Sequence, residues 1–107
     1  MSDNRSKISG VNSPPVERLS WDAWNLEHIA KHDVLPEEAE EVVDGDPYIR
    51  ATYKQRLQLI GPTTAGRMLS IVIGAVPGQP GVFYVFSARP ASRNERGWHV
   101  DAKGGMT

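Results

Sequence analysis

Two of the three histidines in this chain, His28 and His32, lie four positions apart in the stretch "NLEHIAKH". On a helix this spacing places both side chains on one face, where they can bind a metal ion, exchange protons or pack. A metal site needs a third ligand, but Ile29 rather than glutamate follows the first histidine and the chain has no cysteine. We therefore expect no metal site and no cofactor.

The position of His32 leaves two roles open. It follows Lys31 at the expected end of a helix, where positive charge is favoured by the helix dipole. His32 either caps that helix and packs under a sheet, or it is an exposed acid, base or phosphate contact. Histidine in general suits the second role, because the reference pKa of this residue type is about 6.5. His28, one turn earlier beside Ile29, is expected mainly to pack.

Three arginines, Arg56, Arg67 and Arg89, each lie at an end of an expected strand. The planar arginine fork stays ionised and binds phosphate through two parallel hydrogen bonds. Because the start of one antiparallel strand lies near the end of its neighbour, we expect Arg67 and Arg89 to converge. The alternative for each arginine is a solvated charge at the sheet edge.

The stretch "ASRNER" predicts a helix start that carries two more cations. Ser92 and Glu95 have the spacing of a capping box, in which each side chain binds the other's backbone N–H. Arg93 and Arg96 then lie three apart on one helix face, available for phosphate or for an acidic partner surface.

The length and composition of the chain limit how many domains it can form. Its 107 residues and 39% hydrophobic content favour one globular domain over residues 16–100. Residues 1–15, rich in Ser, Asn and Gly, are expected to be a disordered arm, and residues 101–107 a flexible tail. No segment approaches the roughly 18 apolar residues of a membrane span. We expect a cytoplasmic protein without membrane contact, and the absence of cysteine fits a reducing compartment.

The net charge of −1 hides an asymmetry between the two halves. Residues 1–49 hold four Lys/Arg and eleven Asp/Glu, a net charge of −7. Residues 50–107 hold eight Lys/Arg and two Asp/Glu, a net charge of +6. A basic half favours polyanions or acidic proteins as partners, although the two halves also neutralise each other within one domain.

Helical patterns come first and strands follow. Ser20 or Asp22 can cap a helix ending near His32, with Trp21 and Trp24 packing it on a sheet. A second helix follows in "DVLPEEAEEVVDGD", with its proline at the first position. The segments "PYIRATY", "RLQLIG", "RMLSIVIGAV" and "GVFYVFSAR" are β-rich and joined by short turns. We predict an α+β fold with two N-terminal helices on a four-stranded antiparallel sheet, five-stranded if "VERLSW" joins it, and a short C-terminal helix.

The blocks "WDAWNLEHIAKHDVLPEEAEEV" and "FSARPASRNER" resemble the BrnT family of bacterial type II toxins. The resemblance covers about residues 18–98. Family members are ribonucleases with a RelE-like fold, usually held inactive by a ribbon-helix-helix antitoxin. This chain has Asp33 where the family usually has Gly, Gly97 where many members have Arg, and His99 where many have Tyr. The resemblance implies a RelE-like fold, RNA and an antitoxin as partners, and growth arrest by RNA cleavage.

Metal-independent RNA cleavage needs a base for the 2′-hydroxyl, cations for the phosphorane oxygens and an acid for the leaving oxygen. The resemblance therefore implies catalytic roles for His32, Arg67 and Arg89. The residues expected to bind the RNA backbone are Lys31, Arg56, Arg93 and Arg96. The alternative is a non-enzymatic domain, a degenerate toxin that binds a partner protein.

Overall fold

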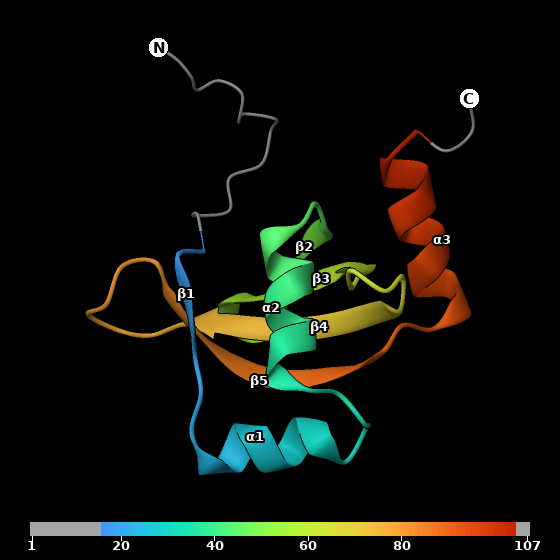
Figure 1. Cartoon of the computed structure of the whole chain (residues 1–107). Coiled ribbons are helices and arrows are strands. Elements are labelled where there is room, and N and C mark those ends of the chain that lie inside the picture. Colours follow the sequence, from blue (N-terminus) through green and yellow to red (C-terminus); the bar gives the residue numbers. More distant parts are fainter. Residues whose placement is uncertain (1–15, 105–107) are drawn as a thin grey trace.

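The computed structural model describes residues 16–104, and within them it has an α+β architecture, which confirms the predicted class. Three α-helices and a five-stranded mixed sheet form the domain (Figure 1). In chain order the elements are β1 Arg18–Ser20, α1 Ala23–Ala30, α2 Pro36–Asp44, β2 Tyr48–Thr52, β3 Arg56–Pro62, β4 Met68–Ala75, β5 Val82–Pro90 and α3 Arg93–Ala102. The predicted arm, residues 1–15, lies outside the described residues.

The sheet has the strand order β1-β5-β4-β3-β2. Strands β2 to β5 form the predicted antiparallel meander, because short connections join antiparallel neighbours. The prediction of an entirely antiparallel sheet is wrong for β1, which pairs parallel to β5 with Leu19 opposite Phe83. Most of the chain separates these two strands, so no tight turn sets their relative direction.

The hydrophobic core lies between one face of the sheet and the first two helices. Helix α1 packs along β5, and α2 packs on β3 and β4, crossing in front of the sheet in Figure 1. Alternate strand residues point into this layer, as the two-residue period of a strand requires. The core contains Leu19, Ile29, Val34, Ala39, Val42, Leu59, Leu69, Ile71, Ile73, Phe83, Val85 and Ala88.

Each helix starts where a local signal places it. Asp22 caps α1: its Oδ1 accepts from the Asn25 N–H at 3.0 Å, and Asn25 Oδ1 accepts from the Asp22 N–H at 2.8 Å. Pro36 opens α2, as predicted. The predicted capping box of Ser92 and Glu95 opens α3, with backbone-to-side-chain distances of 2.8 and 3.2 Å.

Two local predictions differ from the structure. Trp21 packs against the core and donates from Nε1 to Glu40 Oε2 at 2.9 Å, but Trp24 is 55% exposed, so its predicted packing on the sheet is wrong. Helix α3 continues to Ala102, so residues 101–102 of the expected tail are helical. No helix within residues 16–104 is long and apolar enough to cross a membrane.

Candidate functional site

Most of the predicted site residues lie at one end of the sheet, where β4 begins and β5 finishes. The Ala91 N–H donates to Met68 O at 2.9 Å, so the start of β4 adjoins the start of α3. Arg67 immediately precedes β4, and its guanidinium reaches the end of α1. The predicted site residues at this end of the sheet are Lys31, His32, Arg67, Arg89, Arg93 and Arg96. We call these six residues the sheet-end cluster.

Arg67 and Arg89 lie at the same end of the sheet, but their guanidinium groups have different partners. Arg67 donates to Asp33 O at 2.7 Å, to His32 O at 3.3 Å and to Glu38 Oε1 at 3.0 Å. It thereby binds two carbonyl groups of the turn that follows α1. Arg67 therefore supports the connection between α1 and α2, and it is less available for a phosphate than the sequence suggested.

The turn after α1, which carries His32, has an unusual backbone conformation and is held by Arg67 and Glu38. Asp33 has a φ of 59°, the left-handed conformation that glycine adopts most readily. Glu38 Oε1 also accepts from the Leu35 N–H at 3.0 Å. This backbone bond first, and Arg67 second, holds the pKa of Glu38 below its usual value. One arginine and one carboxylate thus fix the turn that carries His32.

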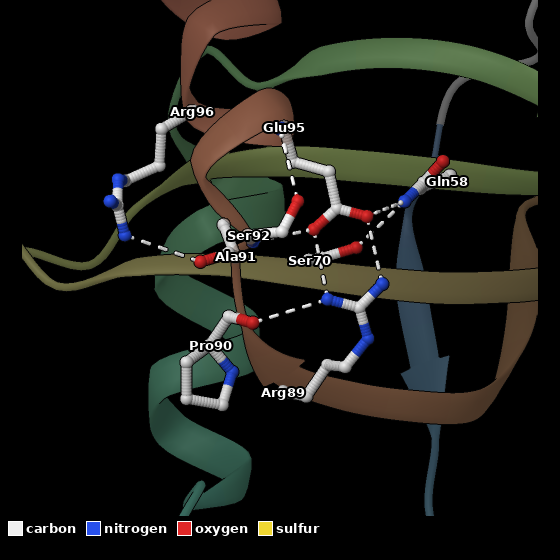
Figure 2. A network of polar contacts seen from close by, with 8 residues as sticks. All are labelled: Gln58, Ser70, Arg89, Pro90, Ala91, Ser92, Glu95 and Arg96. Carbon is white, nitrogen blue, oxygen red and sulfur yellow. Dashed lines mark hydrogen bonds and ion pairs between the residues drawn. The ribbon is translucent and has the colours of Figure 1, made fainter.

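Arg89 forms the most complete polar network of the described residues (Figure 2). Its Nη1 and Nη2 donate to the two oxygens of Glu95, each at 2.8 Å, which is a bidentate pair. Gln58 Nε2 donates to Glu95 Oε2 at 2.9 Å and to Ser70 Oγ at 2.8 Å. The Ser92 N–H donates to Glu95 Oε1 at 2.8 Å. The Glu95 carboxylate therefore joins β3, β5 and α3.

The network fixes the ionisation of both partners. Glu95 is only 7% exposed, and its pKa falls to about 2, chiefly through the hydrogen bonds from Arg89 and against the cost of burial. The same pairing raises the pKa of Arg89. Arg89 also donates from Nη1 to Pro90 O at 3.2 Å. Its Nε–H and second Nη2–H have no acceptor within residues 16–104, so these two donors are available to a ligand.

The other members of the sheet-end cluster have no carboxylate partner among the described residues. Lys31, His32, Arg93 and Arg96 are all exposed. Arg96 donates to Ala91 O at 3.3 Å and points away from the Glu95 carboxylate in Figure 2. Because Glu38 and Glu95 engage Arg67 and Arg89, the unpaired positive charge at this end of the sheet comes from Lys31, Arg93 and Arg96.

The two histidines differ in their surroundings. His28 is partly buried, and its ring stacks on Trp24 with centroids 4.6 Å apart. His32 is exposed, and its ring meets that of His28 edge-on at 6.3 Å. No group of three or more metal-ligating side chains occurs in the part of the chain that the structure describes. The exposure of His32 favours its role as an acid, base or phosphate contact over its role as a helix cap packed under the sheet.

The structure also reveals a set of cations that sequence reasoning did not assemble. Arg56, at the other end of β3, lies over the ring of Phe86 at 3.6 Å from its centroid, and Arg50 lies over Trp98 at 4.7 Å. We call Arg50, Lys54, Arg56, Phe86 and Trp98 the cation–π face. One sequence signal pointed to it: residues 47–94 contain no Asp or Glu.

Comparison with known proteins does not assign the chain to a family. No protein-family model matches the chain, and no curated protein is significantly similar to it.

Proposed function

We propose that this protein is the ribonuclease toxin of a type II toxin–antitoxin system, with a RelE-like arrangement and a metal-independent reaction. The observation that supports the proposal most is the sheet-end cluster. The two sequence blocks that resemble the BrnT family contribute His32 and Arg89, and both residues lie at one cationic end of the sheet. His32 follows helix α1 on the core face, and Arg89 points to the opposite face. The proposal includes RNA as substrate, a ribbon-helix-helix antitoxin as partner and the cytoplasm as location.

The proposed reaction is attack of a ribose 2′-hydroxyl on the adjacent phosphate, which forms a 2′,3′-cyclic phosphate and breaks the bond from phosphorus to the 5′-oxygen of the next nucleotide. The exposed His32 imidazole takes the 2′-hydroxyl proton or donates a proton to the leaving 5′-oxygen, and solvent water serves the other transfer. Arg89 stabilises the phosphorane oxygens through its Nε–H and second Nη2–H. Lys31, Arg93 and Arg96 bind the flanking phosphates. Arg67, first expected to hold the phosphate, instead positions the turn that carries His32.

A second function is favoured by one feature of the structure and one of the sequence. Glu95 binds Arg89 through both oxygens, which neutralises the arginine on which the catalytic proposal depends most. His99 also replaces the tyrosine of many members of the resembled family. Both features suit a degenerate toxin that binds a partner protein without cleaving RNA. In that case the Arg89–Glu95 pair only anchors α3 to the sheet.

A matched pair of variants tests the choice. Arg89→Gln and Glu95→Gln both break the ion pair, but only the first removes the cation. If Arg89 stabilises the transition state, Arg89→Gln should lower RNA cleavage by about a hundredfold or more and relieve growth arrest on induced expression. Glu95→Gln, assayed below its own melting transition, should retain most of the cleavage. Equal activity losses that follow stability would favour the structural role, and wild-type protein that neither arrests growth nor cleaves RNA would favour the interaction domain.

A further inference from the structure

The cation–π face lies on the side of the sheet opposite the hydrophobic core. Leu57 and Leu59 of β3 point toward the core, so Arg56 and Gln58, which alternate with them, point the other way. Arg50 is paired across the strands with Gln58, so it lies on that same side. The guanidinium groups of Arg50 and Arg56 therefore belong to one surface, each lying over an aromatic ring at 4.7 and 3.6 Å from its centroid.

The Arg56–Phe86 stack depends on a glycine in the strand between them. A Cβ at Gly74 would come within 2.8 Å of Phe86 Cε2 and 3.5 Å of Arg56 Cγ. Only glycine leaves room for the ring to lie across β4 beneath the guanidinium. Lys54, Gln55, Arg56, Gly74, Ala75 and Phe86 line a hollow of ≈ 310 Å³ at this place. The stack is therefore a built feature beside an open volume.

The positive charges of this face have no carboxylate partner among the described residues. Arg50, Lys54 and Arg56 take part in no ion pair within residues 16–104. Lys54 and Gln55 hold the turn between β2 and β3 at φ values of 62° and 60°, which non-glycine residues rarely adopt. This strained turn keeps Lys54 at the rim of the hollow. The face offers fixed planar cations and one exposed ammonium group to a polyanion.

We infer that the cation–π face binds single-stranded nucleic acid, with bases stacked on the outer faces of the two guanidinium groups and phosphates bound at their edges. A guanidinium group that lies over a ring has a second face with which another planar group can stack. Bases in a duplex are stacked on each other, so only a single strand has base faces to offer. An acidic peptide would use the charges but not the rings. The inference rests on the proposed function, since it gives the RNA a path across the sheet away from the sheet-end cluster.

Binding of fluorescent 2′-O-methyl oligonucleotides to the full chain, followed by anisotropy, tests the inference. These probes lack the nucleophilic 2′-hydroxyl, so binding is measured without cleavage. Arg56→Lys keeps the charge and loses the planar stack, and Phe86→Leu removes the ring. Each should weaken single-strand binding about tenfold, the scale of one lost stacking contact. Arg18→Lys, at an exposed arginine on the opposite edge strand β1, should have no effect.

The salt dependence separates stacking from charge. Arg56→Lys should leave the slope of log affinity against log salt unchanged, and Arg56→Gln should lower it by about 0.7, the value for one phosphate on a single strand. Unchanged affinity in Arg56→Lys would overturn the inference. So would equal binding of the same sequence as a duplex, or displacement of the oligonucleotide by polyglutamate at equal charge, which would identify an acidic protein as the ligand.

Failure of this inference differs from failure of the proposed function. If the protein cleaves RNA but Arg56→Lys and Phe86→Leu leave KM and oligonucleotide binding unchanged, the cation–π face is not the binding site and the proposed function stands. If the single strand binds as expected but wild-type protein cleaves no RNA, the inference stands and the ribonuclease proposal fails.

Discussion

Replacing Glu95 by Gln should make the stability of the protein less dependent on pH. The carboxylate has its pKa lowered from an ordinary value of 4.5 to about 2, mainly by Arg89. At about 1.36 kcal/mol per pH unit, this corresponds to about 3 kcal/mol of stability at neutral pH. Arg89 is 41% exposed, so solvent screening reduces our expectation to about 2 kcal/mol. The glutamine side chain has nearly the same shape but no charge.

The sign of the effect follows from which state binds protons. The pKa of Glu95 is lower in the folded protein, so between pH 4.5 and pH 2 the unfolded chain binds more protons. The contribution is therefore complete near pH 7 and is lost as the pH falls toward 2. Urea unfolding of wild type and Glu95→Gln should give a difference of about 2 kcal/mol at pH 7 and less than half of that at pH 3. A difference that stays constant over this range would refute the reasoning.

Three further predictions concern the α1 side of the domain. Arg67→Ala should lower the free energy of unfolding by about 1 kcal/mol in urea titrations, because a partly exposed group loses two carbonyl bonds and one ion pair. Asn25→Ala should cost about 3 kcal/mol by the same measurement, since this fully buried amide bonds to both β1 and β5. His32→Ala should lower RNA cleavage about a hundredfold with little change in melting, whereas His28→Ala should lower stability by about 1 kcal/mol and leave the cleavage rate unchanged.

Local signals in the sequence were sufficient for the helix starts and for the meander. Pro36 and the Ser92–Glu95 spacing act within one turn of the chain, so neighbouring residues determine them. The links between β2 and β5 are short, so each strand pairs with the next. The parallel strand β1 was beyond this reasoning, because its partner lies about sixty residues away and Asn25 joins them through tertiary bonds.

The sequence predicted where in the sheet the site residues lie, but not which side chains they contact. Strand-end placement brought Arg67 and Arg89 to one end of the sheet, but their guanidinium groups do not converge: Arg67 binds the turn after α1 and Arg89 binds Glu95 on the opposite face. The sequence did not reveal that Glu95, recognised as a capping residue, also binds Arg89 and Gln58, because the second use of a carboxylate depends on packing between elements. The pairing of Arg50 with Trp98 joins residues far apart in the chain and left no local pattern.

The two carboxylates at the sheet end perform the same task. Glu38 and Glu95 are each the third residue of a helix, and each accepts a backbone N–H at that helix start. Each also binds an arginine, Arg67 or Arg89, so both helix starts are tied to the same end of the sheet. Under the proposed function, a polyanion contacts the unpaired Lys31, Arg93 and Arg96, because the two arginines are already paired. It then reaches Arg89 only through the two donors that Glu95 and Pro90 leave open. The start of α3 therefore sets the orientation of Arg89 and, under the proposed function, the two donors that a phosphate contacts.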